Sequence, residues 1–301
     1  MPIHSNSYPL VSIIMNCYNG EKYLAHAVKS ILKQSYKNFE VIFWDNQSKD
    51  NSANIYKSFK DKRLKYYYAK NFTSLYKARN LAIKKSKGKY VAFLDVDDLW
   101  IKNKLSLQLK KFKDDKIGLV YSNYYILNQF TGLKKIFYKK KLPEGLIYKE
   151  LLNYYCLGLG TVVIRKDIFK NKKSVFDKQY NIIGDFVFFT KISRDINFSC
   201  IQKPLLIYRV HKNSLSNKNY QMHINELKLW YKKQNFFDHK MLYFIEQKIL
   251  YMETMLNIYN KRYFLSVKKL FKINSFKKKL NIIIFLLMPN FILKELKNNF
   301  S

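Results

Sequence analysis

The chain has 301 residues, of which 48% are hydrophobic and 17% aromatic, so it can bury a sizeable core and is not a low-complexity disordered protein. It carries 56 lysines and arginines against 21 acids, a formal net charge of +35 that favours nucleic acid, anionic lipid or phosphorylated small molecules as partners. A general composition rich in Lys, Asn, Ile, Tyr and Phe accounts for the charge equally well.

Three widely spaced cysteines without a CxxC pair argue against a disulfide scaffold or a zinc site, and they fit a reducing cytosol. The N-terminus lacks a basic region ahead of a long apolar core, so no signal peptide is expected. No apolar run reaches the ~18 residues that a membrane-spanning helix needs. The nearest run, residues 280–293, is interrupted by Pro289.

The first third of the sequence alternates between short β-branched or aromatic runs and segments with apolar residues at helical spacing. Strands are expected at 10–18, 39–46, 64–69 and 90–95, and helices at 20–35, 48–61 and 75–88. This alternation predicts a mostly parallel sheet with helices on both faces. Such sheets bind ligands at the carboxyl ends of their strands, and the residues after each expected strand are polar.

The rest of the sequence is less regular at first and then becomes helical. The expected elements are strands at 117–127 and 161–169, a short helix at 184–195, a strand that opens the segment 204–216, and helices at 239–259, 263–273 and from 275 onward. We expect an α/β catalytic domain over 1–216 and a basic helical region over 217–301.

Three acids close the fourth expected strand, in "KYVAFLDVDDLW". A strand that ends in Asp95-x-Asp97 presents two hard carboxylate ligands, which suit Mg²⁺ or Mn²⁺ together with waters and substrate phosphates. The alternative is a solvated turn that caps the next helix. For Asp98 the cap is the simpler interpretation.

Two other positions in the first third suit a nucleotide. Asp45 ends the second expected strand, where a carboxylate can accept hydrogen bonds from a base or ribose, although a polar turn gives the same pattern. Arg79 lies in "KARN" on the third expected helix, where a guanidinium can make a bidentate contact with phosphate. A solvated helix face is the alternative, chiefly for Lys77.

Candidate residues for chemistry also occur later in the chain. Asp185 is a lone acid in "IIGDFVFF", where a carboxylate suits a general base and a helix N-cap is the alternative. In "LLIYRVHKNSLS" Arg209 and His211 alternate, so both point to one face of a strand. A histidine beside a phosphate-bound metal is a suitable ligand, whereas a lone histidine is more often a surface or satisfied core residue.

The order of these stretches is more specific than any one of them. "NCYNGEKYL", "VIFWDNQSKD", "ARNLAI", "KGKYVAFLDVDD", "GD" and "LLIYRVHKNSLS" follow one another over about residues 8 to 216. This order resembles the family 2 glycosyltransferases of the GT-A fold, in the bacterial branch that builds lipopolysaccharide, capsule and other surface glycans. The resemblance implies a Rossmann-like α/β fold with a nucleotide-sugar half over 1–100, an acceptor half over 101–216 and a C-terminal helical extension.

The resemblance also implies roles for individual residues. The nucleotide sugar is bound by residues of the first half: Tyr18, Asn19, Asp45, Arg79, Asp95 and Asp97. Mn²⁺ or Mg²⁺ is held by two of these acids and a late histidine: Asp95, Asp97 and His211. Asp185 matches the catalytic base. On the acceptor side we place Gly158, Gly160 and Arg209.

The implied reaction is the inverting, metal-dependent transfer of a sugar from a nucleotide-diphosphate donor to a hydroxyl of a glycan or lipid-linked acceptor. We expect the donor to be UDP-linked. Two positions depart from the family pattern. Gly184 precedes Asp185 where the family often has glutamate, which bears on the base. Asn46 follows Asp45 where the family's donor loop usually has a second acid, which bears on the nucleotide contacts.

Residues 276–297 combine a lysine cluster with a run of Ile, Phe and Leu. Such a segment can lie on the anionic inner face of the cytoplasmic membrane, which would make the enzyme a peripheral membrane protein. A helix packed on the catalytic domain or on a partner is the alternative.

Two rival functions stay open: a non-catalytic, membrane-associated scaffold with the same fold, and a nucleic-acid-binding protein. The tyrosines at 66–68 beside lysines are the best sign of the latter. No DNA- or RNA-binding motif occurs in the sequence, so we expect no nucleic-acid partner.

Overall fold

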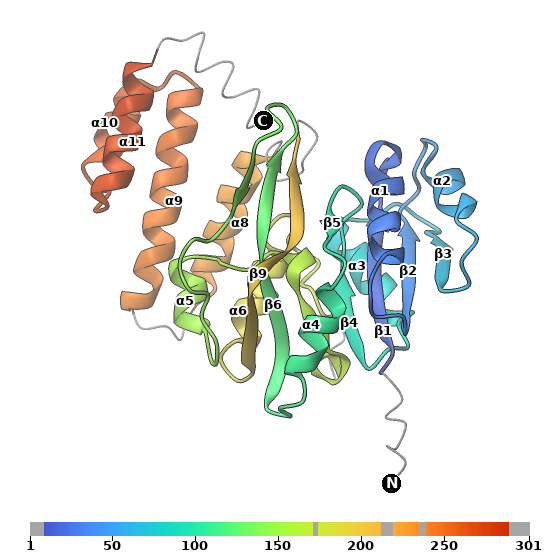
Figure 1. Ribbon diagram of the computed structural model, residues 1–301. Helices are drawn as coiled ribbons and strands as arrows, with labels where there is room; N and C mark the ends of the chain where they lie inside the picture. Colours follow the sequence, from blue (N-terminus) through green and yellow to red (C-terminus); the bar gives the residue numbers. More distant parts are fainter. Residues whose placement is uncertain (1–8, 171–173, 212–218, 235–238, 289–301) are drawn as a thin grey trace. The chain divides into compact units, whose positions relative to one another are not determined.

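The computed structural model describes residues 9–170, 174–211, 219–234 and 239–288 (Figure 1). The chain divides into two compact units. Unit 1 contains Met1–Tyr148 and Cys156–Arg209, and unit 2 contains Lys149–Tyr155 and Val210–Ser301. The predicted tail segment 276–297 lies only in part within the described residues, which end at 288.

The first half of unit 1 alternates strands and helices, as the sequence predicted. Its elements are β1 Val11–Cys17, α1 Glu21–Leu32, β2 Phe39–Asp45, α2 Ser52–Ser58, β3 Leu64–Tyr68, α3 Leu75–Lys84 and β4 Tyr90–Phe93. β1 pairs with β2 and β4, and β2 pairs with β3, all in parallel register. Because helices cover both faces, β2 and β4 are buried along their whole length and β1 along nearly all of it.

The second half of unit 1 extends the same sheet with a different pairing. Its elements are β5 Leu99–Trp100, α4 Lys104–Lys111, β6 Ile117–Asn128, β7 Lys134–Ile136, η1 Leu159–Thr161, β8 Val163–Arg165, η2 Lys166–Phe169, α6 Gly184–Ile192 and β9 Asn197–Val210. The strand order is β3-β2-β1-β4-β8-β6-β9-β5, with β7 on β6. β8 is antiparallel to β4 and β6, and β5 is antiparallel to β9.

The parallel pairing expected for the sheet thus holds for its first four strands, and the later strands make the sheet mixed. A physical reason lies in the connections. The five residues between β6 and β7 allow only a hairpin, which forces antiparallel pairing.

Two element boundaries differ from the sequence prediction for local reasons. The segment 161–169 was expected to be a strand, but only Val163–Arg165 is extended and 3₁₀ turns flank it. α2 begins at Ser52 and not near residue 48, because the intervening residues bond to side chains. Ser48 donates its N–H to Asp45, and Ser52 donates its N–H to Asp50.

One face of the sheet packs on α1. The amphipathic spacing of this helix places Leu24, Val28 and Ile31 against Ile13 and Met15 of β1. Side chains that alternate along a strand point to opposite faces, so the intervening β1 residues point to the other face, where they too are buried. The core therefore fixes β1 and β2 rigidly, and the loops at their carboxyl ends start from fixed points.

Unit 2 is helical. It contains α8 Tyr220–Lys232, α9 His239–Tyr259, α10 Tyr263–Leu270, α11 Phe276–Leu287 and most of α5 Tyr148–Asn153. Its small core is formed by Met255, Ile258, Ile273 and Ile282. Glu253 of α9 forms ion pairs with Lys228 of α8 and Lys269 of α10. Among the described helices, none combines the length and apolarity required to cross a membrane.

Candidate active site

The loops that follow β1 and β2 are bonded to each other. Asn19 has a positive φ of 54°, which asparagine tolerates better than most residues. Its N–H donates to Ser48 Oγ at 3.0 Å, and its side-chain oxygen accepts from the Lys49 N–H at 2.8 Å. Tyr18 is exposed, and its ring lies 4.8 Å from that of Phe72. Tyr18 and Asn19 therefore sit at the end of β1, on the edge where the sequence placed the ligand.

Asp45 ends β2 beneath these loops and is completely buried. Its two carboxylate oxygens accept hydrogen bonds from the Ser48 N–H and the Tyr66 hydroxyl, each at 2.7 Å. Burial, followed by the hydrogen bond to Asp45, raises the pKa of Tyr66. The neighbouring Asn46 is also buried and donates to the Thr73 carbonyl at 2.8 Å. Asp45 and Asn46 therefore connect the loop after β2 to Tyr66 of β3 and to the backbone at Thr73.

The acidic stretch after β4 forms a turn, in which the Asp98 N–H donates to the Asp95 carbonyl. Asp95 and Asp97 are half-buried, whereas Asp98 is only 3% exposed. Asp98 accepts a hydrogen bond from the backbone N–H of Arg209 at 2.9 Å. Burial raises the pKa of Asp98 well above its usual range, and the charges of Asp97 and Asp95 add to this shift. Asp98 therefore anchors the turn from inside and does not cap α4.

Arg209, which the sequence placed on the acceptor side, lies against this turn. Its Nε donates to the Asp97 carbonyl at 2.8 Å, and one terminal nitrogen donates to Gln129 at 2.6 Å. Its guanidinium also lies 4.7 Å from the centre of the Tyr23 ring. Arg209 thus fixes the backbone of the acidic turn to the end of β9.

A continuous series of contacts links the acidic turn to Asp185. Arg79 of α3 is buried and pairs with Asp95 Oδ1 at 2.6 Å. One helical turn earlier, the Tyr76 ring lies 5.1 Å from the Arg79 guanidinium. The Tyr76 hydroxyl lies 2.9 Å from Asp185 Oδ1 and 3.1 Å from the Ile182 carbonyl. The series Asp95–Arg79–Tyr76–Asp185 joins residues that are up to 109 positions apart in the chain.

Tyr76 can only act as a donor in this series. It is fully buried, and burial followed by the charge of Asp185 raises its pKa well above the ordinary value, so the hydroxyl keeps its proton. Gly184 makes room for its ring. A Cβ at residue 184 would lie 2.6 Å from the Tyr76 ring, closer than side chains tolerate. Position 184, where the family often has glutamate, is therefore a glycine because the Tyr76 ring fills the space that a side chain would need.

Tyr76 and Asn80 are functional candidates that the sequence reading missed. Asn80, beside Arg79 in "ARN", donates to the Phe176 carbonyl and accepts from the Phe176 N–H, which fixes the segment that precedes α6. A signal for Tyr76 was present: it precedes Arg79 by three residues, so both side chains share one face of a helix. Its contact with Asp185 could not be predicted from neighbouring residues, because the two lie 109 positions apart in the chain.

The two predicted acceptor-side glycines lie in and next to η1. The Gly158 carbonyl accepts from the Thr161 N–H and hydroxyl. The Gly160 carbonyl accepts from the Trp100 indole at 2.9 Å, and a Cβ on Gly160 would meet Leu206 at 3.0 Å. Gly160 is buried in the core beneath this segment, and Gly158 is half-buried.

The three predicted metal ligands do not form one cluster. Within the described ranges, no group of three or more His, Cys, Asp and Glu side chains is arranged to hold a metal ion. Asp95 and Asp97 lie in the same turn of unit 1, whereas His211 belongs to unit 2. His211 therefore stays a prediction.

Solved structures of other proteins share the fold of this chain. The crystal structure of S. aureus TarS 1-349 in complex with UDP matches with a TM-score of 0.61 at 20% identity over 96% of this chain and 88% of that one. The mannosyltransferase PcManGT of Pyrobaculum calidifontis, solved with GDP-Man and Mn²⁺, has a TM-score of 0.61 at 14% identity over 98% and 86% of the two chains. The fold is that of the GT-A glycosyltransferases, as the sequence predicted.

The sequence comparisons give the family. The Glycosyl transferase family 2 profile matches residues 12–181. The Escherichia coli UDP-Glc:alpha-D-GlcNAc-diphosphoundecaprenol beta-1,3-glucosyltransferase WfgD is 33% identical over 70% of this chain and 81% of its own. The putative teichuronic acid biosynthesis glycosyltransferase TuaG of Bacillus subtilis is 34% identical over 54% and 65%. The chain belongs to glycosyl transferase family 2 and is a glycosyltransferase, so the predicted family and enzyme class are confirmed.

Proposed function

We propose that the enzyme transfers a sugar, with inversion, from a UDP-linked donor to a hydroxyl of a lipid-linked acceptor in the synthesis of a surface polysaccharide such as lipopolysaccharide or capsule. The observation that carries the proposal is the contact series Asp95–Arg79–Tyr76–Asp185, which connects a candidate diphosphate site with a candidate base. The names of the WfgD and WfaP relatives, which specify UDP-Glc and a diphosphoundecaprenol acceptor, support the donor and acceptor classes.

The acidic turn suits a divalent cation. The Asp95 side chain is 39% exposed although one of its oxygens pairs with Arg79, and Asp97 is half-buried, so both keep access to solvent. Two carboxylates in one turn match a hard cation that takes waters and substrate phosphates among its other ligands. Asp95 and Asp97 would hold Mn²⁺ or Mg²⁺, with His211 as the further predicted ligand. The ion would supply positive charge at the diphosphate.

The chain's own residues then have separate tasks. Arg79, held between Asp95 and the Tyr76 ring, presents a fixed guanidinium charge where negative charge develops on the departing diphosphate. Asp185 accepts the proton of the acceptor hydroxyl as that oxygen attacks the anomeric carbon from the opposite face. Tyr76 holds the Asp185 carboxylate in place through its hydroxyl. Tyr18 and Asn19, which follow β1, lie beside the nucleotide, and the buried Asp45 holds the neighbouring loop after β2 in place. Gly158 and Gly160 shape the acceptor side.

The base assignment is tested by Asp185→Asn, with the exposed Asp195→Asn as a control on the segment after α6. We expect Asp185→Asn to lower kcat by about 10² to 10⁴-fold, the range of general-base catalysis, while UDP binding changes little. Asp195→Asn should transfer sugar at the wild-type rate. Unimpaired transfer by Asp185→Asn would show that another group accepts the proton.

The metal assignment has its own test. Asp97→Ala should abolish the dependence of UDP binding on Mn²⁺, because one of the two predicted carboxylate ligands is lost. An unchanged metal titration would place the ion elsewhere.

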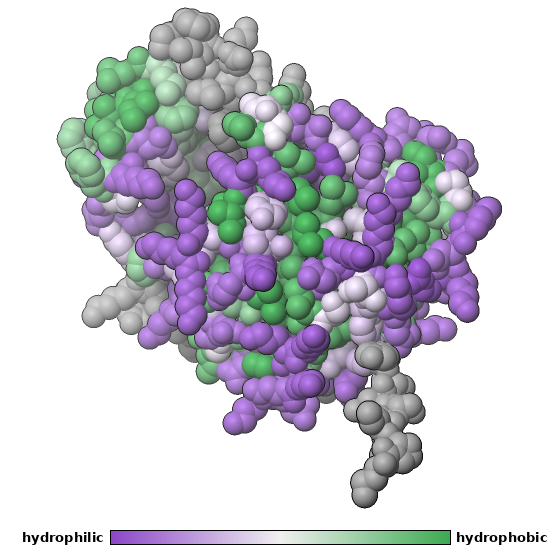
Figure 2. Space-filling view, in the orientation of Figure 1, coloured by the Kyte–Doolittle hydropathy of each residue, from purple (hydrophilic) through white to green (hydrophobic). Residues whose placement is uncertain are grey.

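The acceptor class predicts contact with a membrane, and α10 and α11 carry a suitable surface. Figure 2 shows a hydrophobic surface over these helices. Its exposed side chains include Phe264, Phe271, Phe276 and Leu287, which are 75–82% exposed. Lysines at 268, 272 and 277 are exposed on the same helices and around them. Apolar side chains beside lysines are typical of helices that lie on anionic lipid. We place the enzyme on the inner face of the cytoplasmic membrane.

Vesicle flotation tests this placement. Replacing both Phe271 and Phe276 by serine should reduce flotation with anionic vesicles, whereas Phe130→Ser, on an exposed loop of unit 1, should not. Equal flotation of the double variant and the wild type would argue against the α10–α11 surface as the membrane contact.

A further inference from the structure

The hydroxyl of Tyr124 is an open polar group at the end of a buried side chain. Tyr124 lies on β6 and is only 9% exposed. Its hydroxyl forms no hydrogen bond with the described residues, yet it is not one of the buried polar atoms that lack a partner among them. The oxygen therefore reaches solvent. A tyrosine hydroxyl can both donate and accept a hydrogen bond, so this one is available to a ligand.

Two other aromatic rings hold the ring of Tyr124 in place. Phe137 stacks on it, with 4.3 Å between the ring centres and 14° between the ring planes. Tyr208 of β9 packs against it edge-on, at 6.2 Å and 76°. The Phe137 N–H also donates to the Tyr124 carbonyl at 2.9 Å. A rigid ring thus presents the hydroxyl, which lowers the entropy lost when a ligand binds to it.

The hydroxyl end of Tyr124 borders the segment that the sequence placed on the acceptor side. A Cβ on Gly158 would lie 3.5 Å from Cε1 of the Tyr124 ring and 3.7 Å from Cζ, the atom that carries the hydroxyl. The Gly158 carbonyl already accepts from the Thr161 N–H and hydroxyl. All of these residues belong to the second half of unit 1, which the family resemblance assigns to the acceptor. The free polar group at this place is therefore the tyrosine hydroxyl and not the glycine carbonyl.

Two carboxylates of the candidate site act on this hydroxyl. Burial, and then the charges of neighbouring groups that include Asp98 and Asp185, raises the pKa of Tyr124 well above its ordinary value. Asp98 belongs to the acidic turn and Asp185 is the predicted base, so the hydroxyl lies within electrostatic range of both. It keeps its proton and can donate that proton to a sugar oxygen.

We propose that Tyr124 binds the acceptor, with its hydroxyl donating a hydrogen bond to an oxygen of the acceptor sugar close to the hydroxyl that attacks. The inference rests on the proposed function, because it requires an acceptor sugar beside Asp185. It goes beyond that function by giving the acceptor a recognition residue that no sequence motif indicated. A hydrocarbon offers this hydroxyl no partner, whereas a sugar offers several oxygens.

Transfer kinetics of Tyr124→Phe test the proposal with a soluble probe. The acceptor is N-acetylglucosamine α-linked to a short alkyl diphosphate, because the names of WfgD and WfaP specify GlcNAc-diphosphoundecaprenol. We expect KM for this acceptor to rise about tenfold, in line with the loss of one hydrogen bond. KM for the UDP-sugar and the urea midpoint should not change, since the ring packing is kept. An unchanged acceptor KM, or a rise in the donor KM in its place, would overturn the proposal.

The matched control is Tyr125→Phe. Tyr125 follows Tyr124 on β6 and is half-buried, but adjacent side chains of a strand point to opposite faces. The control thus removes the same group from the same strand on the side away from the acceptor. Both of its KM values should equal those of the wild type. A similar rise in its acceptor KM would indicate a general effect on β6 and contradict a specific contact at Tyr124.

Acceptor analogues distinguish a contact from a change in packing. Three versions of the probe lack the N-acetyl group, the 4-hydroxyl or the 6-hydroxyl. With the wild type, loss of the oxygen that Tyr124 contacts should raise KM about tenfold. With Tyr124→Phe the same analogue should cause no further rise, because its partner is already absent. Additive losses for all three analogues would mean that Tyr124 contacts none of these groups, and the proposal would fail.

A binding measurement separates this inference from the proposed function. Calorimetry on the full chain with UDP present reports binding of the probe without transfer. If the wild type transfers sugar to the probe from no UDP-sugar, the proposed function is wrong. Binding that is about tenfold weaker in Tyr124→Phe would still support the role of Tyr124. Equal binding by variant and wild type, or no binding by either, would overturn it.

Discussion

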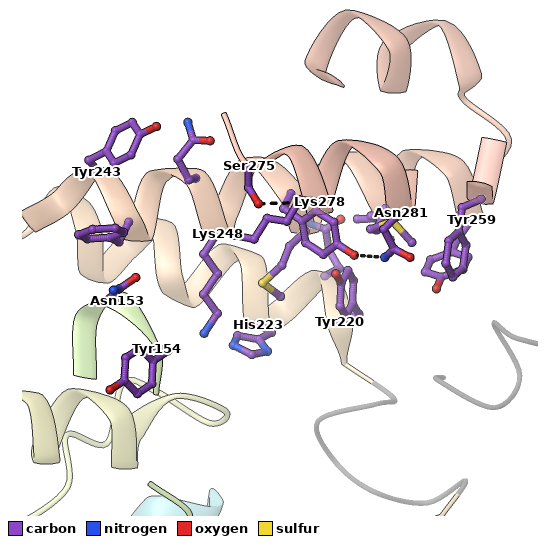
Figure 3. Close-up of a pocket in the computed structure, with 18 of the residues that line it drawn as sticks. Asn153, Tyr154, Tyr220, His223, Tyr243, Lys248, Tyr259, Ser275, Lys278 and Asn281 are labelled. Atoms are coloured by element: carbon purple, nitrogen blue, oxygen red, sulfur yellow. Dashed lines mark hydrogen bonds between the residues drawn. The ribbon is translucent and has the colours of Figure 1, made fainter. Parts of the chain in front are cut away.

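The candidate site of unit 1 and the pocket of unit 2 differ in how their polar groups are held. In unit 1 Arg79 pairs with Asp95, and Asp98 accepts a hydrogen bond from the backbone at the end of β9. In unit 2 the pocket has two lysines and a histidine among largely apolar and aromatic side chains (Figure 3). The contacts of unit 1 therefore organise its site before substrate arrives.

The largest effect is expected at the close contact between Gly184 and the Tyr76 ring. Gly184→Ala places a methyl group 2.6 Å from the Tyr76 ring, and overpacking of this kind costs roughly 1–3 kcal/mol. Urea unfolding should show this loss of stability together with reduced transfer. Gly158→Ala is the matched control, because its Cβ would meet Tyr124 at an ordinary 3.5 Å and its φ of −109° suits any residue. Equal stabilities for the two variants would mean that Tyr76 moves aside freely.

A smaller effect is expected from Tyr76→Phe, which removes one hydroxyl and keeps the ring. The hydroxyl stabilises the charged form of the Asp185 carboxylate, so without it the carboxylate takes up a proton at higher pH. The acidic limb of the pH profile of kcat/KM should therefore move to higher pH, with the loss of activity greatest on the acidic side.

Tyr56→Phe is the control for this variant. Tyr56 is equally buried on a helix, and its hydroxyl has no hydrogen-bond partner in the described structure. Its pH profile should match the wild type. A Tyr76→Phe profile that also matches would leave Tyr76 with a packing role only.

The smallest effect concerns unit 2. The pKa of His223 is lowered to about 4 in the folded chain, so between about pH 4 and its ordinary value of 6.5 the unfolded chain binds more protons. Stability should therefore fall as the pH drops through this window, by an amount of order 1 kcal/mol for a half-buried histidine. His223→Gln should flatten this part of the profile, and His26→Gln, at an exposed position on α1, should not. Parallel profiles for His223→Gln and wild type would show that His223 is solvated in the folded state.

Local pattern was enough to predict the first half of unit 1 and α9, α10 and α11 of unit 2. Buried β-branched runs and helical spacing are properties of neighbouring residues, and α9 was expected over the same residues, 239–259, that it occupies. The antiparallel second half of the sheet was not predicted, because strand direction depends on which distant strands pair. The confirmed family came from the order of motifs, and the site assignments made from it stay predictions.

The contacts that organise the site were beyond local pattern for the same reason. The hydrogen bond between Arg209 and Asp98 joins residues 111 positions apart, and the one between Tyr76 and Asp185 joins residues 109 positions apart. From the sequence, a cap on the following helix was the simpler interpretation of Asp98, because that helix is the nearest element along the chain. Only the folded chain brings a strand end to it instead. The cavity in unit 2 likewise requires three helices and a short distant segment to meet.

The hydrogen bond from Arg209 to Asp98 also has a mechanical consequence. Arg209 is the last residue of unit 1, and the chain continues into unit 2 at Val210. The strand that leads out of the catalytic unit is therefore tied at its final residue to the turn that carries Asp95 and Asp97. Arg209 also donates from its Nε to the Asp97 carbonyl, so two hydrogen bonds, of 2.9 and 2.8 Å, connect this residue to the turn. A change in the backbone at Arg209 would therefore displace the turn that carries the two predicted metal ligands.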